Sequence, residues 1–406
     1  MSSNTTRGVT QLESSKAIRA FQREWLKKVR ERVSQGEPFA ICNGDEFEEV
    51  LNIMDIPFMI INYWNALIHV KGLADYYSDL LDKRGYDGCH RFAGGVASTM
   101  DNDPETAPWG GLPKPAVIIA STRHAELKVL EIWAREFGCP VYPLEFNFIS
   151  SPDNPVPPRW WERLRDHWDE IIDPKELDVR VEQTKALISY LEVTTGRKFS
   201  LAKLNKAMDL VNEQMDYWGM ARDLIAETVP CPVSLRDQLT MYQTEWHRGT
   251  PEGRDFIKSF YEEVKYRVDK GMAANPDEKL RLMWIAGTPP AWSRYVEDKY
   301  GAVCVCCWFS SIPIDGYART VLNNDPLRTL AGRHMLIFAH TPDWLLKDAK
   351  LHQCHGMIET ASPTGPSLNK QVFEEGGVPS VEIPYDKDDE KVRAILSEFI
   401  ETRLLS

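Results

Sequence analysis

The amino-acid sequence predicts an α/β protein with two Rossmann-like lobes, each a doubly wound parallel sheet, and an additional helical segment. Short, continuously apolar segments alternate with amphipathic helices around residues 114–146 and again in the last third of the chain. The stretch between these two series, 181–228, is strongly helical. Two separate series predict two sheets rather than one. The expected units are the N-terminal helices with the first lobe (1–160), a helical linking region (161–278) and the second lobe (279–406).

Length and charge exclude several classes of protein. The chain has 406 residues, with 48 Lys and Arg against 60 Asp and Glu, which gives a formal net charge of −12. Such an acidic chain is not expected to bind a nucleic-acid backbone or an anionic membrane. No apolar run reaches the ~20 residues that span a bilayer, and the polar N-terminus lacks the apolar core of a secretion signal. We therefore expect a soluble, cytoplasmic protein.

The first lobe is predicted from one βαβ unit preceded by helical patterns. In the helix of this unit, Leu130 and Trp133 share an apolar stripe, Lys128 and Glu131 lie away from it, and Gly138 ends it. In order, the expected elements are a helix at Ser15–Gln35, a helical pattern after Asn43 interrupted by Pro57 and Phe58–Trp64, a strand at Ala116–Ala120, a turn at Ser121–His124, a helix at Ala125–Phe137 and a strand at Pro140–Leu144.

The helical middle and the second lobe follow the same reasoning. Gly196 breaks the helical stretch, Ser200 is the expected cap of its second helix, and another helix covers Gly253–Met272. The second lobe is expected to contain strands at Leu280–Ala286, Gly301–Phe309, Gly356–Glu359 and Val378–Ile383, with helices at Ala291–Lys299 and Leu368–Glu375.

Ligands of open α/β sheets bind at the carboxyl ends of the strands, where three loops qualify. These loops are Ser121–His124, Gly287–Trp292 and Thr360–Pro366. In the first, Arg123 and His124 fit an anion clamp with an acid/base group, although Arg123 could equally pair with a neighbouring carboxylate. The sequence has neither a P-loop lysine nor a Gly-x-Gly-x-x-Gly fingerprint after a predicted strand, so nucleotide hydrolysis and ordinary nicotinamide binding both lack support.

The loop after the Gly356 strand has an unusual composition. Its Ser362 and Thr364 hydroxyls and a glycine stand directly before a predicted helix. They could hold a phosphate or a carboxylate, but an ordinary capping loop is the simpler interpretation of this composition.

Eight cysteines are too sparse for a disulfide scaffold and fit a reducing compartment. Three of them lie in the β-type run around Cys304, where strand alternation places Cys304 and Cys306 on one face and Cys307 on the other. We interpret them as buried strand residues. A Cys/His patch at His352–His355 precedes the Gly356 strand and therefore lies at its amino end, which favours a structural role over metal binding.

The order and spacing of several stretches resemble subunits of the 2-hydroxyacyl-CoA dehydratase and benzoyl-CoA reductase superfamily. The similarity extends from about residue 40 to about residue 400. The stretches that carry it are Gly88–Gly94, Leu112–Ala120, Lys128–Pro140, Thr184–Lys198, Leu282–Pro289 and Phe373–Ile383.

The resemblance implies two Rossmann-like lobes and a heterodimer of related subunits. Well-formed members hold an oxygen-sensitive [4Fe–4S] cluster through three cysteines, and an ATP-dependent activator protein supplies one electron. Such a low-potential electron allows anaerobic dehydration of a 2-hydroxyacyl-CoA thioester, or reduction of an aromatic ring in the aryl-CoA relatives. The sequence does not choose between the two reactions.

This chain departs from the family pattern at the cluster. Only Cys89 falls on a cluster position; Ser121–His124 and Thr360–Pro366 occupy the other two and contain no cysteine. A lone thiolate cannot hold a cubane. The resemblance therefore implies a divergent subunit that completes the acyl-CoA site beside a cluster-bearing homologous partner.

In this interpretation Arg123 and His124 are the catalytic candidates, and Ser362, Thr364 and Trp292 are the candidate substrate contacts. Two alternatives stay open at the sequence level. One is a non-catalytic structural subunit, and the other is a cluster-free acyl-CoA hydratase or lyase that uses His124 as its general base.

Overall fold

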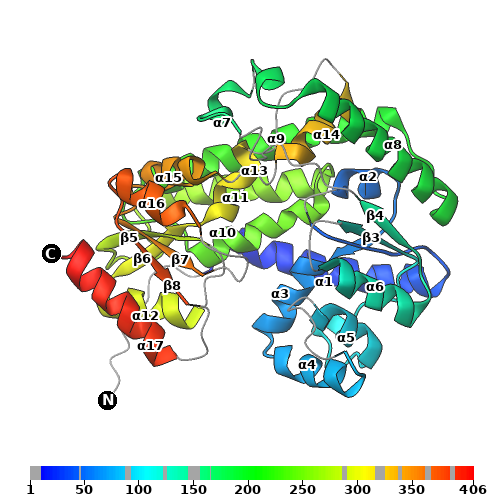
Figure 1. The fold of residues 1–406 in the computed structure, drawn as a ribbon, viewed down its shortest axis with the longest axis horizontal. Helices are drawn as coiled ribbons and strands as arrows, with labels where there is room; N and C mark the ends of the chain where they lie inside the picture. Colours follow the sequence, from blue (N-terminus) through cyan, green and yellow to red (C-terminus); the bar gives the residue numbers. More distant parts are fainter. Residues whose placement is uncertain are drawn as a thin grey trace.

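The computed structural model describes residues 11–44, 47–86, 93–121, 126–144, 156–164, 166–285, 290–315, 325–336, 341–361, 367–384 and 389–406. Two four-stranded parallel sheets, flanked by helices, form two lobes, so the predicted α/β class with two lobes is confirmed (Figure 1). Within the described residues, no helix has the length and apolar character needed to cross a membrane.

The first sheet has the strand order β2-β1-β3-β4. Ile41 at its centre is paired with Met59 on one side and with Ile118 on the other. Every residue of β1 and β2 is buried, as expected of parallel strands covered on both faces. The strands are β1 (Ala40–Cys42), β2 (Phe58–Ile60), β3 (Val117–Ser121) and β4 (Val141–Leu144).

The second sheet repeats this topology with the order β6-β5-β7-β8. Its central strand β5 is paired with β6 and β7, for example through Met283 with Met357. The strands are β5 (Leu280–Ile285), β6 (Ala302–Cys306), β7 (Gly356–Thr360) and β8 (Ser380–Ile383).

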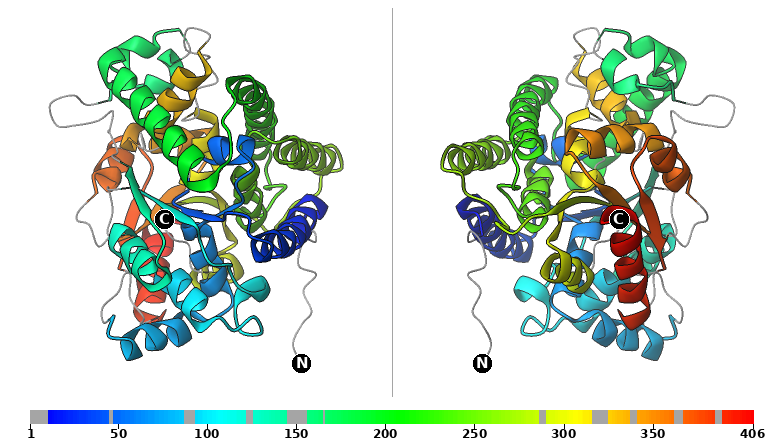
Figure 2. Two further views of the ribbon diagram at one scale, coloured as in Figure 1. Left: turned by 90° about the vertical axis from the view of Figure 1, so that its right-hand side faces the viewer. Right: turned by 90° about the vertical axis from the view of Figure 1, so that its left-hand side faces the viewer.

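Helices cover both sheets and connect the two lobes. The long helices α1, α9 and α11 lie side by side as one layer (Figure 2). The bounds are α1 (Glu13–Ser34), α2 (Glu48–Ile53), α3 (Ile61–Val70), α4 (Ala74–Lys83), α5 (Gly94–Asp101), α6 (Glu126–Phe137), α7 (Trp160–Arg163), α8 (Pro174–Thr195), α9 (Leu201–Glu227), α10 (Leu235–Tyr242), α11 (Pro251–Asp269), α12 (Pro290–Tyr300), α13 (Trp308–Asp315), α14 (Pro326–Leu336), α15 (Pro342–Leu351), α16 (Asn369–Glu375) and α17 (Asp389–Phe399).

Local signals set the ends of the predicted helices. Ser200 caps α9 by accepting a hydrogen bond from the Lys203 main-chain N–H, and Gly196 ends α8 in the left-handed conformation. In α6, Leu130 and Trp133 are buried while Lys128 and Glu131 are exposed. These predictions are confirmed.

The strands differ from the sequence analysis in two places. The helix expected after Asn43 is α2, but strands β1 and β2 on either side of it were not predicted, and residues 58–60 of the interrupting stretch pair in the sheet before α3 begins. The strand expected at Gly301–Phe309 ends at Cys306, because the chain turns into α13 at Trp308.

The predicted faces of the β6 cysteines were also wrong. A bulge shifts the register so that Leu282 is paired with Cys304 but the next residue, Met283, is paired with Cys306. As a result, Cys304 and Cys307 pack in the core below α12 and α17, and Cys306 packs in the core on the opposite face. All three are buried, as predicted.

Candidate functional site

Each sheet has a topological switch point, where neighbouring central strands continue in opposite directions across the sheet. The switch points lie between β1 and β3 in the first sheet and between β5 and β7 in the second. Ligands of open α/β sheets bind at the carboxyl ends of such strand pairs. The three loops chosen from the sequence follow β3, β5 and β7, so all three belong to a switch point.

Most of the predicted site residues lie outside the described residues. This holds for Arg123, His124, Ser362 and Thr364, and for the matched cluster position Cys89. Their roles stay predictions. The strand ends and helix starts that position these loops are described, and they carry polar side chains of their own.

Asn43 stands at the first switch point and was missed by the sequence analysis. It directly follows β1, is only 4% exposed, and its side-chain carbonyl oxygen has no hydrogen-bond partner within the part of the chain that the structure describes. A buried amide that lacks a partner is uncommon in proteins and often marks a ligand contact. The signal in the sequence was a polar Asn-Gly pair after a short apolar run, which the sequence analysis did not interpret as a strand.

At the second switch point, the end of β7 also carries buried polar side chains. Glu359 accepts a hydrogen bond from the Asn369 side chain at 2.9 Å, while its other carboxylate oxygen is buried without a partner. Thr360 accepts a hydrogen bond from the Trp284 indole at 3.0 Å. These contacts fix both ends of the loop that contains Ser362 and Thr364, because Asn369 opens α16.

Trp292 lies in the first turns of α12 and is buried. Its indole N–H donates to Asp389 at 2.9 Å, and the ring packs with the core beneath α12 and α17. Its contact with substrate stays a prediction, and its observed contacts tie α12 to α17.

A buried ion-pair cluster near the first switch point joins α2 to α14. Glu49, on the helix that follows β1, forms a bidentate ion pair with Arg333 of α14, and both side chains are fully buried. Arg248 lies 3.5 Å from the carboxylate of Glu48 and 4.0 Å from that of Glu49. Burial and the adjacent Arg333 guanidinium hold the pKa of His334 well below its usual range. The acidic and basic partners of these ion pairs are far apart in the sequence, so no local pattern could have indicated the pairs.

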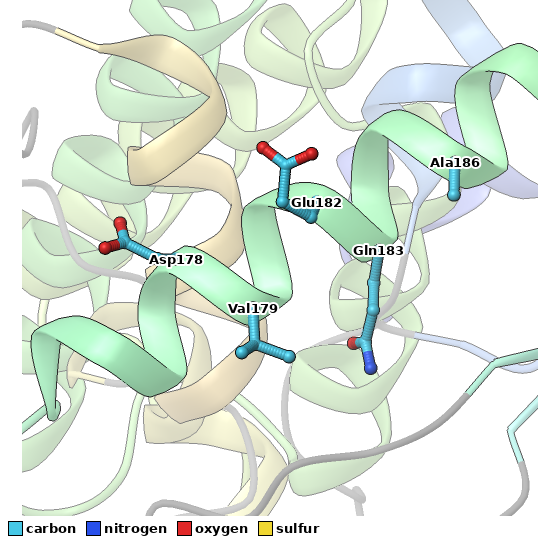
Figure 3. A pocket seen from close by; sticks show the side chains of 5 residues that line it. All are labelled: Asp178, Val179, Glu182, Gln183 and Ala186. Atoms are coloured by element: carbon cyan, nitrogen blue, oxygen red, sulfur yellow. The ribbon is translucent and has the colours of Figure 1, made fainter.

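A shallow hollow of about 500 Å³ lies elsewhere, over α8 (Figure 3). Its described lining residues are Asp178, Val179, Glu182, Gln183 and Ala186. Asp178 already forms an ion pair with Arg328, and the two acidic side chains would repel an anionic CoA thioester. The hollow is therefore not the candidate site.

The cysteines do not fit the cluster that the resemblance implies. After Cys89 the next cysteine is Cys139, which lies beyond α6, and none follows Cys354, so neither the loop between β3 and α6 nor the loop after β7 contains a thiol. Burial raises the pKa of Cys231 and of Cys307 to about 12 and raises that of Cys304 further. In the absence of a metal ion these thiols are protonated at neutral pH.

Comparison with known families agrees with this architecture. The sequence model of the family described as 2-hydroxyglutaryl-CoA dehydratase, D-component, matches residues 105–404. None of the curated proteins matches the chain. The matched region starts after Cys89 and runs from the approach to β3 through the whole second sheet, so it includes the carboxyl ends of β3, β5 and β7 but not that of β1. Because the match covers about three-quarters of its length, the chain belongs to the 2-hydroxyglutaryl-CoA dehydratase D-component family.

Proposed function

We propose that this chain is the cluster-free subunit of a 2-hydroxyacyl-CoA dehydratase-like complex and completes the acyl-CoA site beside a [4Fe–4S]-bearing homologous subunit. Family membership supports a dehydratase subunit that acts on an acyl-CoA. The observation that carries the finer proposal is the absence of any cysteine in the loops after β3 and β7. A cluster needs several convergent thiolates, so in this proposal the partner holds it and receives the electron from the activator protein.

The proposed contribution of this chain is to bind and orient the acyl group. Arg123 would hold a carboxylate or the thioester oxygen as a charged clamp, and His124 would move a proton near neutral pH. Ser362, Thr364 and Trp292 would complete the contacts from the second lobe. The buried polar side chains of Asn43 and Glu359 support this proposal, since each marks the switch point from which one of these loops starts.

The first test measures iron and acid-labile sulfide in anaerobically purified protein. The chain is prepared alone and as a complex with a co-expressed homologue that has all three cluster cysteines. We expect labile sulfide in the complex and none in the isolated chain. A brown isolated chain with stoichiometric sulfide would refute the proposal, and dehydration by the isolated, iron-free chain would favour the cluster-free hydratase instead.

The second test replaces the proposed clamp in the reconstituted complex. Because hydrogen bonds to charged groups contribute about 1.5–3 kcal/mol, Arg123→Ala should lower kcat/KM roughly ten- to a hundred-fold. Arg123→Lys should restore part of the loss. The exposed Arg84→Ala is the matched control and should not change turnover. Unchanged turnover in both Arg123→Ala and His124→Gln would leave only a structural role for this subunit.

A further inference from the structure

Four side chains with metal-binding atoms meet where α15 covers the second sheet. Cys306 ends β6, Asp348 and His352 lie one turn apart at the end of α15, and Cys354 precedes β7. Single ligand atoms of Cys306, Asp348 and His352 all lie within 4.8 Å of one another, and these three residues are buried. The Cys306 and Cys354 sulfur atoms are 3.7 Å apart.

Two atoms of this cluster, Asp348 Oδ2 and His352 Nε2, are buried and have no hydrogen-bond partner among the described residues. The His352 Nδ1 lies 2.9 Å from the main-chain carbonyl oxygen of Asp348, so Nδ1 carries the hydrogen and Nε2 keeps a free lone pair. Leaving such groups unpaired costs about 1–3 kcal/mol each. A bound cation would satisfy both atoms at once.

We propose that Cys306, Asp348, His352 and Cys354 bind one zinc ion as a structural site of the second lobe. Two sulfurs at about 2.3 Å from a tetrahedral zinc ion stand roughly 3.8 Å apart, which matches the observed 3.7 Å. Mixed sulfur, nitrogen and carboxylate donors suit zinc rather than magnesium or calcium. The helical spacing of Asp348 and His352 presents both to one ion, as two ligands four residues apart commonly do.

The surroundings of the site hold its ligands in position. The Ser311 hydroxyl donates to the Asp348 carboxylate at 2.5 Å, and the main-chain contact of His352 Nδ1 fixes the orientation of its ring. Such outer contacts are typical of zinc sites. Cys354 is only partly buried and offers the ion a route from solvent.

The bulge in β6 is what makes this site possible. It turns Cys306 to the α15 face of the sheet, away from Cys304 and Cys307. Zinc would then tie the end of β6 to the connection between α15 and β7, which are 42 residues or more apart in the chain. The site is independent of the proposed acyl-CoA site, because none of its residues belongs to the loops after β3, β5 or β7.

The test measures metal and sulfide in the isolated full-length chain, purified anaerobically without a metal-binding tag. We expect about one zinc ion per chain and no labile sulfide. Replacing zinc by Co²⁺ should give the visible bands of a tetrahedral site with thiolate charge transfer. Removing zinc with a chelator should lower the Tm.

Substitutions at the proposed zinc ligands test which residues bind the ion. Asp348→Asn, which keeps the shape of the side chain, and Cys354→Ser, at the partly exposed position, should each weaken zinc binding by roughly a hundred-fold. Cys354→Ser should also weaken the thiolate charge-transfer band of the Co²⁺ form. Cys304→Ser and Cys307→Ser are the matched controls on the opposite face of the sheet and should retain zinc and the band.

Three outcomes would overturn the zinc site. One is a metal-free chain, the second is a Cys306–Cys354 disulfide in protein prepared under reducing conditions, and the third is iron bound together with sulfide. Turnover of the complex is a separate measurement, so failure of the zinc site and failure of the proposed function can be told apart.

Discussion

His247 is a histidine enclosed by aromatic rings. Its ring centroid lies 4.9 Å from that of Phe21, 5.7 Å from that of Trp25 and 5.4 Å from that of the stacked Trp246. Burial lowers the pKa of His247 to about 3, because the apolar surroundings disfavour the imidazolium form. The ring therefore serves as a neutral packing residue, and its Nε2 atom has no hydrogen-bond partner.

Because His247 is buried, the free energy of unfolding depends on pH in the acidic range. Between pH 6.5 and 3 the unfolded chain binds a proton at His247 that the folded chain does not, so the free energy of unfolding falls as the pH falls. The loss is about 1.4 kcal/mol per pH unit for one such group, and none of it is present above pH 6.5. His247→Phe keeps the aromatic packing and removes this term.

Urea denaturation at about pH 5 and about pH 7.5 measures the effect. His247→Phe should lie within about 1.5 kcal/mol of the wild type at the higher pH and lose less stability on acidification. The exposed His69→Gln should leave the acid slope unchanged. An acid slope in His247→Phe as steep as that of the wild type would contradict the neutral packing role.

Single residues of the candidate site could be predicted only where they follow a recognisable strand. The loop with Arg123 and His124 was located because an apolar run stops there and a helix begins. Asn43 and Glu359 were missed, since burial and the lack of a partner arise only after folding. The Glu49–Arg333 pair was unpredictable for the same reason, because its members are 284 residues apart.

At the scale of elements, long helices were easier to predict than short strands. Helices α8 and α9 each contain several turns and have caps at Asp173 and Ser200, so periodicity and end signals agree. Strands β1 and β2 have only three residues each, too few for a period to show. Their identity comes from pairing with β3 and with each other.

The start of α11 depends on a glycine for reasons of space. The Thr250 hydroxyl accepts from the Gly253 main-chain N–H at 3.1 Å and donates to the His247 carbonyl at 2.6 Å, which draws the two segments together. A Cβ atom on Gly253 would lie 2.2 Å from that same carbonyl oxygen. This is backbone, which cannot move aside without breaking the cap.

Gly253→Ala should therefore destabilise the protein, although Gly→Ala inside a helix normally stabilises by about 0.5–1 kcal/mol. Overpacking of this kind typically costs about 1–3 kcal/mol, and the loss of the Thr250 cap acts in the same direction. Urea denaturation measures the difference. The exposed Ser259→Ala on the same helix is the control and should stay within about 0.5 kcal/mol of the wild type. A stabilised Gly253→Ala would show that the helix start can shift.

At the scale of the molecule, the two sheets share one strand order and meet through the helices between them. The core of the first sheet includes Leu187 of α8, Leu204 of α9 and Leu330 of α14, so helices from later parts of the chain pack against it. The two-lobe fold was predictable because strand and helix patterns alternate along the sequence. The way in which the lobes pack together was not predictable from the sequence. The domain limits at 160 and 278 stay a prediction.

The buried Glu49–Arg333 pair is expected to hold this junction together. Arg333→Met removes the bidentate partner and leaves a carboxylate with no access to water, a change that costs about 3–5 kcal/mol for a buried pair. Arg248 remains 4.0 Å from Glu49 and reduces the penalty, so we expect a loss of about 3 kcal/mol. Replacing both partners, as in Glu49→Gln with Arg333→Met, should restore part of it, because no unpaired charge is then buried.

Urea denaturation followed by tryptophan fluorescence and by circular dichroism tests this at the level of the whole chain. If the pair couples the lobes, the two probes should coincide in the wild type and separate in Arg333→Met, since one lobe then unfolds before the other. Arg254→Met, which breaks a solvent-exposed pair with Glu213, should cost at most about 1 kcal/mol and keep the transitions coincident. A loss in Arg333→Met no larger than in this control would mean that apolar packing by α8, α9 and α14 alone joins the lobes.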